Sequence, residues 1–253
     1  MLRFMRAWLA GPWSQKRYPR YAPELPPRFR GRPTVQVRSP DNGFERSLPV
    51  VPTDALRVRS DGLPVIDLGS CLFSPEEAVE GGDILVEYTR DISMSSSTRE
   101  GLETPTGIPD PVAALQKTMR SHLGRSLRLR SVVAGSCGGC ESELNALGNV
   151  VFDMSRLGIQ FVASPRHADG LVITGAVNPN MLDALQRTYD AVPEPRIVIA
   201  VGACAASGGP FRGSLEVLLI PPSIPVDLWI PGCPPHPLTV LDGLLGLLGR
   251  LAR

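Results

Sequence analysis

Apolar runs alternate with amphipathic stretches throughout residues 112–253. We predict strands at 127–134, 159–163, 171–175, 197–202 and 226–231, and helices at about 112–124, 141–157, 179–191 and 235–252, with a short helix after Cys204. Strands that alternate with amphipathic helices indicate a parallel sheet covered on both faces. The pattern therefore predicts an α/β fold for this part of the chain.

The pattern of the first half is shorter and less regular. Residues 1–12 have near-helical apolar spacing, which predicts a short amphipathic helix. Proline and arginine dominate the next stretch, which predicts an extended arm lying over a partner. We divide the chain into a basic arm with a short helix (1–40), an irregular region with a weak internal repeat (41–92), a Ser-, Thr-, Gly- and Pro-rich linker (93–111) and the α/β part (112–253).

Charge is unevenly placed along the chain, although the net charge is only +1. Residues 1–40 contain nine Arg or Lys and a single Glu. Such an arm indicates an acidic partner or an anionic lipid surface, or else a solvated tail. We find neither a run of ~18–20 apolar residues nor a secretory signal. We therefore expect a reducing compartment, where cysteines bind metal more often than they form disulfides.

Four of the five cysteines follow apolar runs that we predict as strands. Cys137 and Cys140 form a C-x2-C pair after one run, and Cys204 and Cys233 follow two later runs. Because the carboxyl ends of parallel strands share one edge, we expect the four thiols to converge. Four thiolates suit a [4Fe–4S] cluster or a zinc site. Zinc sites more often use two close pairs, so this spacing favours the cluster; unrelated buried thiols are the remaining alternative.

Glycines flank these cysteines in every motif. Small residues allow backbone N–H groups to approach the sulfurs of a cluster and tune its potential. We therefore expect four of them to line the cofactor, namely Gly138, Gly139, Gly202 and Gly232.

Four stretches, GSCGGCESE, SPRHADGLVITGAV, VGACAASGG and PGCPPHP, together resemble the cluster-bearing small subunit of group 4 membrane-bound [NiFe] hydrogenases. Formate hydrogenlyase and the proton-pumping NADH:quinone oxidoreductase (complex I) belong to the same superfamily. The resemblance covers about 126–250 and implies a flavodoxin-like, doubly wound parallel sheet. It also implies one proximal [4Fe–4S] cluster, ligated by Cys137, Cys140, Cys204 and Cys233.

The spacing of the first two cysteines distinguishes two branches of this superfamily. In complex I the corresponding cysteines are adjacent, whereas Gly138 and Gly139 separate them here, which is the hydrogenase-like form. The resemblance implies a [NiFe]-hydrogenase-like or quinone-type large subunit as partner, together with an integral membrane subunit. It places the chain peripherally on the cytoplasmic side of the cell membrane, and we expect no nucleic-acid partner.

The N-terminal stretch KRYPRYAPELPPRFRGRP resembles the opening of the two-cluster ferredoxin subunits of the same complexes. Residues 41–92 then fit two degenerate copies of the motif C-x2-C-x2-C-x3-C-P. The ligand positions are Asp41, Phe44, Ser47 and Val51 in the first copy, and Cys71, Ser74, Glu77 and Gly81 in the second. One cysteine cannot hold a thiolate cluster, so we predict a degenerate ferredoxin-like (α+β) region without clusters that retains a docking role.

Two further residues near the cysteines could take part in the chemistry. Complex I has a glutamate near the position of Glu143, so the resemblance suggests proton coupling; acidic residues also favour helix N-termini for electrostatic reasons alone. His236 follows Cys233 closely and either hydrogen-bonds near the cluster or is a surface histidine. The last helix is apolar almost all round, and we expect burial against partner subunits, with packing inside the domain as the alternative.

These features predict an electron-transfer subunit of a membrane-associated oxidoreductase complex. The chain itself should not activate H2, because a [NiFe] centre needs a second set of cysteines and only one C-x2-C is present. A complex I-like quinone-linked subunit, or a structural bridge with a vestigial redox role, are the alternatives.

Overall fold

The computed structural model describes residues 18–23, 25–37, 53–59, 63–75, 84–117, 119, 121, 126–135 and 137–251. These residues form three sheets, one of five strands and two smaller ones. None of the helices in these ranges combines the length and apolarity that a membrane span requires.

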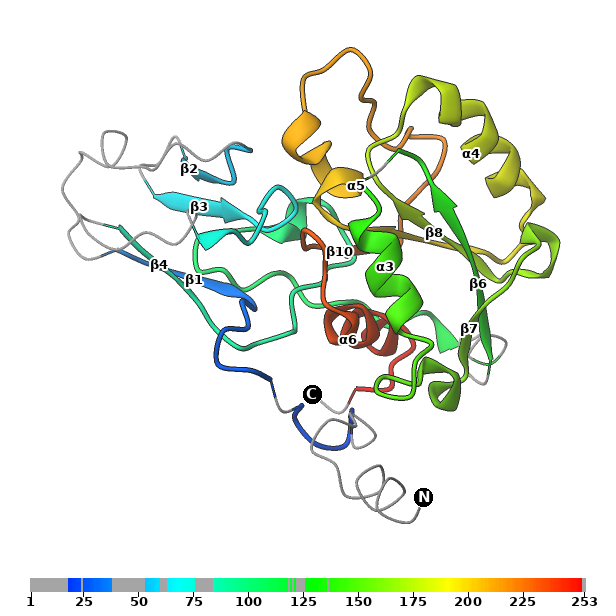
Figure 1. The fold of residues 1–253 in the computed structure, drawn as a ribbon, viewed down its shortest axis with the longest axis horizontal. Coiled ribbons are helices and arrows are strands. Elements are labelled where there is room, and N and C mark those ends of the chain that lie inside the picture. The colour runs from blue at the N-terminus through cyan, green and yellow to red at the C-terminus, as the bar shows by residue number, and fades with distance from the viewer. Residues whose placement is uncertain are drawn as a thin grey trace, which may run out of the picture.

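The five-stranded sheet organises the second half of the chain (Figure 1). Its strands are β6 (Leu127–Val133), β7 (Ile159–Phe161), β8 (Gly170–Thr174), β9 (Ile197–Val201) and β10 (Leu228–Ile230). All neighbouring pairs are parallel, in the order β10-β9-β8-β6-β7. Numbered along the chain this order is 2-1-3-4-5, the flavodoxin-like arrangement, so the predicted fold class is confirmed.

Helices cover both faces of this sheet, as Figure 1 shows. The α-helices are α3 (Gly139–Ala146), α4 (Pro179–Ala191), α5 (Ala203–Ser207) and α6 (Pro237–Leu247), and the 3-10 helices are η4 (Glu100–Leu102), η5 (Met154–Leu157), η6 (Pro165–His167) and η7 (Gly209–Phe211). Successive residues of a strand point to opposite faces of the sheet, and the side chains of β8 alternate in this way. Val172 packs in the core with α3 and α6, whereas Leu171 and Ile173 pack with α4.

Several predicted boundaries are wrong because local hydrogen bonds end the helices early. The helix predicted at 141–157 stops at Ala146. Beyond it the Asn149 side chain accepts hydrogen bonds from the backbone N–H groups of Val151 (2.8 Å) and Phe152 (3.2 Å). Such an Asx turn competes with the helical pattern. Residues 112–116 of another predicted helix are not helical.

The last helix also differs from its predicted span of 235–252. It begins at Pro237, a residue well suited to a first helical position, and the His236 side chain accepts a hydrogen bond from the Leu238 N–H (3.2 Å). Every residue of α6 is buried within this chain. The alternative expectation, packing inside the domain, therefore holds for this helix.

The N-terminal part consists of two small antiparallel sheets, which lie to the left in Figure 1. One pairs β1 (Pro33–Val37) with β4 (Ile84–Tyr88); the other joins β2 (Leu56–Val58), β3 (Pro64–Asp67) and β5 (Glu103–Thr104). Most positions of the two degenerate ferredoxin motifs lie outside the described residues, as does the predicted helix at 1–12. The ferredoxin-like assignment therefore stays a prediction.

The described part of the N-terminal arm packs on its own chain. The buried Tyr18 hydroxyl donates to the Asp242 carboxylate of α6 (2.9 Å), and Arg156 donates to the Tyr18 carbonyl (2.8 Å). Further along, Arg32 pairs with Asp91 (2.8 Å) beside β1. These contacts attach the arm to α6 and to the N-terminal sheets.

The segment predicted as a linker, residues 93–111, is packed between the two parts of the chain. Ser95 and Ser96 are buried, and Ser96 exchanges two backbone hydrogen bonds with Trp229 of β10 (3.1 and 2.8 Å). This single antiparallel bridge adds the segment to the β10 edge of the main sheet.

The arm contact gives a first testable prediction. Tyr18→Phe removes the hydroxyl and leaves the buried Asp242 carboxylate without this donor, so the free energy of unfolding should fall by about 1–3 kcal/mol. Chemical denaturation of the full chain measures this loss.

Tyr189→Phe is the matched control, because Tyr189 is buried to a similar degree (9% exposed against 6%). Its hydroxyl makes no hydrogen bond within the described part of the chain, so the change should stay within about 0.5 kcal/mol. Equal losses in the two variants would show that the Tyr18 hydrogen bond does not hold the arm.

Candidate metal centre

Three loops that leave the same edge of the sheet carry the four cysteines. Cys137 lies four residues beyond β6, and Cys204 and Cys233 each lie three residues beyond β9 and β10. Cys140 sits in the first turn of α3, directly after the Cys137 loop. Since all these strands are parallel, the thiols gather at their common carboxyl edge, where open α/β sheets bind ligands.

Backbone hydrogen bonds join two of these loops. The N–H of Gly202 donates to the Ile230 carbonyl and that of Ala203 to the Gly232 carbonyl, both at 2.8 Å. They continue the β9–β10 pairing past the strand ends. The loops of Cys204 and Cys233 are therefore held in register with each other.

Two glycines permit the close approach of these loops. Gly202 has φ +92°, and a Cβ there would lie 2.6 Å from the Cys140 sulfur. Gly232 has φ +143°, and a Cβ there would lie 2.4 Å from Cα of Pro235. Both positions therefore exclude a side chain on steric as well as conformational grounds.

The other two predicted glycines lie beside Cys137 under weaker constraints. A Cβ on Gly139 would stand 3.6 Å from the Cys137 sulfur, which is ordinary contact, and one on Gly138 would meet nothing within 4 Å. Gly138 precedes α3 at φ +88°, so its backbone conformation, not space, favours glycine.

The thiols influence one another electrostatically. Burial, then the negative charges of Glu141 and the other three cysteines, raise the pKa of Cys140 to about 12. Burial, then Cys233, Cys137 and Glu141, raise the pKa of Cys204 to about 11. The four sulfurs are thus close enough to oppose one another's ionisation.

This donor set fits a group that brings its own positive charge. Cys140 is buried and Cys204 half-buried, whereas Cys137 and Cys233 are exposed, so the set extends from the protein interior to its surface. Four thiolates held by glycine-containing loops suit an iron–sulfur cluster. Within the described ranges, no three His, Cys, Asp or Glu side chains lie close enough together to hold a single metal ion.

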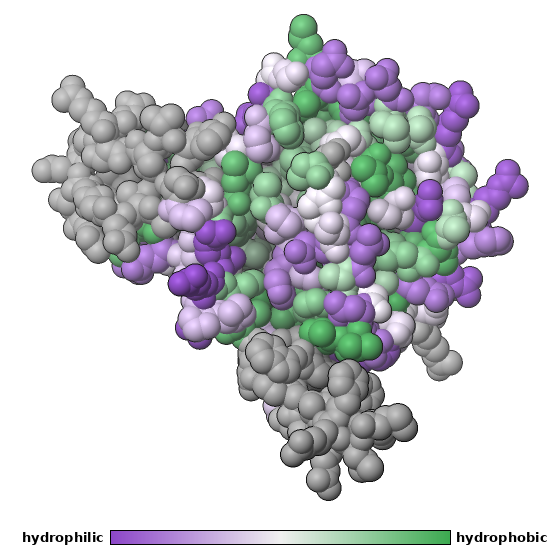
Figure 2. All heavy atoms as spheres, viewed as in Figure 1, coloured by the Kyte–Doolittle hydropathy of each residue, from purple (hydrophilic) through white to green (hydrophobic). Residues whose placement is uncertain are grey.

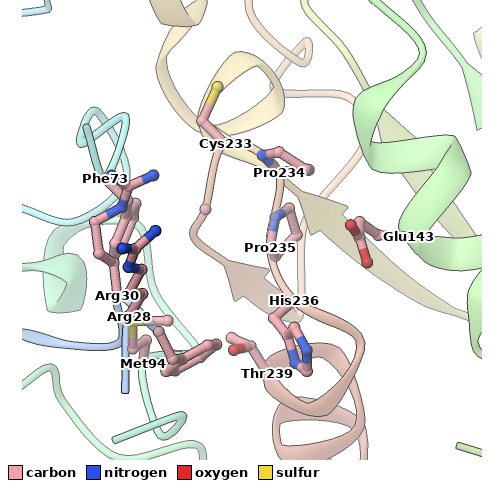
Figure 3. A pocket seen from close by; sticks show the side chains of 12 residues that line it. Arg28, Arg30, Phe73, Met94, Glu143, Cys233, Pro234, Pro235, His236 and Thr239 are labelled. Atoms are coloured by element: carbon pink, nitrogen blue, oxygen red, sulfur yellow. The ribbon is translucent and has the colours of Figure 1, made fainter. Parts of the chain in front are cut away.

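A pocket of about 270 Å³ opens beside Cys233 (Figure 3). The residues that line it are Arg28, Phe29, Arg30, Phe73, Met94, Glu143, Gly232, Cys233, Pro234, Pro235, His236 and Thr239. In Figure 3 the Cys233 sulfur points away from the other labelled side chains, while Arg28 and Arg30 come from the N-terminal arm. The arm therefore supplies cationic groups within reach of the cysteine loops.

His236 is held in this pocket by two aromatic rings. Phe29 and Phe152 meet its imidazole edge to face, with centroids 5.2 and 5.6 Å away. Burial lowers the pKa of His236, and its Nδ1 accepts from the Leu238 N–H, so the neutral ring carries its proton on Nε2. His236 is half-buried and caps α6; it is not a surface histidine.

Glu143 lies on α3 and faces the same pocket. Burial raises the pKa of its carboxyl, which brings the group closer to proton exchange at physiological pH. Sequence reasoning identified Glu143 but missed the two aromatic neighbours of His236 and the arginines opposite. No local motif indicates these neighbours, because they come from segments more than 80 residues apart in the chain.

Residues 137–247 match the protein family described as NADH ubiquinone oxidoreductase, 20 Kd subunit. Formate hydrogenlyase subunit 7 of Escherichia coli (strain K12) is 38% identical to this chain over 157 residues. That match covers 60% of this chain and 60% of the relative, so the chain spans less than two thirds of that subunit.

Two other relatives come from an archaeon and a bacterium. The probable membrane-bound hydrogenase subunit mbhJ of Pyrococcus furiosus is 41% identical over 132 residues, covering 52% of this chain and 79% of the relative. An NADH-quinone oxidoreductase subunit of Citrifermentans bemidjiense is 46% identical over 113 residues, covering 45% of this chain and 66% of the relative. Among solved structures, one chain of the membrane-bound sulfane sulfur reductase, an archaeal respiratory membrane complex, is 32% identical. The TM-score is 0.47, and the match covers 54% of this chain and 76% of that chain.

The glycine contact at Cys140 can be tested directly. Gly202→Ala strains the backbone and pushes a methyl group against the Cys140 sulfur, so it should lower the iron content and cost about 3 kcal/mol or more of unfolding free energy. Iron analysis and denaturation of the full chain measure both effects.

Gly213→Ala serves as the control, because Gly213 has a positive φ but open space around it and lies outside the cysteine motifs. It should cost only about 1–2 kcal/mol and leave the iron content near that of the wild type. The steric account of Gly202 would be wrong if its variant bound iron as well as Gly213→Ala does.

Proposed function

The chain belongs to the family of the 20 Kd subunit of NADH ubiquinone oxidoreductase, and on this premise we propose that it is the electron-transfer subunit of a membrane-associated oxidoreductase complex. It would hold one [4Fe–4S] cluster through Cys137, Cys140, Cys204 and Cys233. The convergence of these four thiols at one sheet edge is the observation that carries the proposal.

The backbone around the cysteines positions them to bind this cluster. The β9–β10 pairing and its continuation through Gly202 fix the loops of Cys204 and Cys233, while α3 presents Cys140 from the buried side. Once bound, a [4Fe–4S] cluster supplies exchange of single electrons. Buried groups around Cys140 exclude water on one side, and the exposed Cys137 and Cys233 leave the other side open to a partner.

An exposed apolar loop next to the site favours docking of a catalytic subunit there. The loop after α5 exposes Phe211, Leu215 and Leu219, which are 55%, 94% and 59% accessible. Figure 2 shows an apolar projection at the top, where this loop stands out from the molecule. A large subunit docked on this face would bring its active centre near the cysteines.

We assign the partner to the hydrogenase type, with an integral membrane subunit completing the complex. The two glycines between Cys137 and Cys140 are the hydrogenase-like form, and the match to the formate hydrogenlyase subunit is longer than that to the quinone-linked subunit. The chain would then lie peripherally on the cytoplasmic side of the membrane. A large subunit that copurifies with this chain and carries paired C-x2-C motifs at both ends would support this assignment, and one without them would favour a quinone-linked complex.

The N-terminal region would contribute docking surface and no cluster. Its one cysteine, Cys71, is fully buried, with its sulfur 3.8 Å from the Tyr88 hydroxyl. Beside the cluster, Glu143 would exchange protons with the pocket that it lines, since its carboxyl is half-buried with a raised pKa.

Removal of a single thiol tests the cluster. Cys204→Ala should abolish the visible charge-transfer absorption and reduce the iron content from about four per chain towards zero, because three thiolates hold a cubane poorly. Anaerobic purification of the full chain with iron and sulfide analysis provides the measurement.

Cys71→Ala is the matched control, since it removes the fifth cysteine, which packs in a hydrophobic cluster with Ala55, Phe73 and Met94. It should keep about four irons per chain. Iron-free wild-type protein would refute the electron-transfer role and favour a structural bridge, and about eight irons or more would contradict the cluster-free N-terminal region.

A further inference from the structure

One arginine connects the N-terminal three-stranded sheet to the helix that carries Cys204. Arg99 directs Nη1 and Nη2 to the two carboxylate oxygens of Asp67, at 2.8 and 2.6 Å. Its Nε donates to the Ala206 carbonyl of α5 at 2.8 Å. The planar guanidinium thus satisfies a carboxylate and a helix carbonyl at once, a geometry that lysine cannot reproduce.

Asp67 is fixed before it meets this arginine. Its side chain on β3 is only 2% exposed, and it also accepts from the Ser70 hydroxyl (2.6 Å) and the Gly69 N–H (2.9 Å). Burial raises the pKa of Asp67. The hydrogen bond and positive charge of Arg99, together with the hydrogen bonds from Ser70 and Gly69, outweigh burial, so the pKa of Asp67 lies below its ordinary value. The carboxylate therefore stays ionised and holds the guanidinium in one orientation.

Close packing restricts Arg99 further. A Cβ on Gly69 would lie 2.8 Å from Cζ of Arg99, so the β3 turn rests directly on the guanidinium. The Arg99 side chain is 22% exposed. Its position is therefore set by the sheet and by packing, and less by solvent.

The contact with Arg99 lies at the C-terminal end of the short helix α5. The helix spans five residues; the Gly208 N–H donates to the Cys204 carbonyl, and Arg99 provides a donor for the Ala206 carbonyl. A cation at a helix C-terminus also compensates the negative end of the helix dipole. The Arg99 guanidinium supplies both a hydrogen-bond donor and a positive charge at Ala206, which is two residues after Cys204.

The same segment supports the neighbouring cysteine loop. Ser96, three residues before Arg99, is the residue that pairs with Trp229 on β10, and β10 leads directly to Cys233. Trp229 in turn packs against the core of the N-terminal sheet. Two of the three cysteine loops are thus supported by residues 96–99.

We propose that Arg99, oriented by Asp67, is a positioning residue for Cys204, through which the N-terminal sheet sets the geometry of the metal centre. This inference rests on the proposed function, since the thiolate that it positions is taken to be a cluster ligand. It assigns the N-terminal region a role in the redox site in addition to docking.

The test compares Arg99→Lys with Arg32→Lys in the full chain. Arg32 also contacts an aspartate through two nitrogens, Nε and Nη2, and is similarly shielded, but its partner Asp91 lines a different pocket, with Tyr18 and Asp242. Hydrogen–deuterium exchange of the α5 amides, whose N–H groups at Ala206 and Gly208 donate to Gly202 and Cys204, reports on the helix. Exchange should rise about tenfold in Arg99→Lys, the effect of losing a charge-assisted hydrogen bond, and remain unchanged in Arg32→Lys.

The electron paramagnetic resonance spectrum of the reduced cluster gives the second readout. Its g-values should shift in Arg99→Lys and match the wild type in Arg32→Lys. Unchanged α5 exchange in Arg99→Lys, or equal changes in both variants, would overturn the proposal. A faster-exchanging helix with an unaltered spectrum would also overturn it, because the contact would then support the helix without positioning the thiolate.

A milder variant and the apo chain keep the proposal testable. If Arg99→Lys does not fold, Asp67→Asn removes the orienting charge at constant shape and should raise α5 exchange in the same direction; no rise would overturn the proposal. If the wild-type chain holds no iron, the proposed function fails, and α5 exchange in the iron-free variants alone then decides whether Arg99 holds the helix.

Discussion

Four thiols that share one edge of a parallel sheet repel one another as they ionise. The structure around them therefore depends on a positive charge that compensates the four thiolates. Burial and mutual repulsion raise the pKa values of Cys140 and Cys204 to about 12 and 11, so neither thiol ionises readily alone. An iron–sulfur core would supply the missing positive charge. The parallel strands, the paired loops and the glycines at closest approach all serve to keep these thiols together.

The strands and helices that the sequence predicted best are those with strong local signals. The helix α4 matches its predicted span of 179–191 because Asn178 caps its first turn (2.9 Å to the Asn180 N–H) and a proline follows at its first position. Strands β8 and β9 are buried at every residue, and Thr174 is their one polar residue. Where a side chain competes for backbone groups, as Asn149 does after α3, hydrophobic spacing alone predicted too long a helix.

The candidate site, too, was predictable from the sequence only where the signal is local. Cysteine spacing and strand order predict four thiols at one edge of the sheet, because parallel strands end at a common edge. The contacts that orient the site were not predictable, since they join distant segments; Arg99 and Ala206 are 107 residues apart. The composition of residues 93–111 is typical of a linker, yet Ser96 and Arg99 connect both halves of the molecule there. Composition indicates flexibility only where no tertiary partner is available.

The most direct measurement is anomalous scattering at the iron absorption edge from crystals of the anaerobically purified chain or its complex. We expect a single iron-containing peak at the carboxyl edge of the five-stranded sheet, bonded to the sulfurs of Cys137, Cys140, Cys204 and Cys233. A peak elsewhere, or one bonded to only some of these sulfurs, would contradict the account of the metal centre and of the loops that form it.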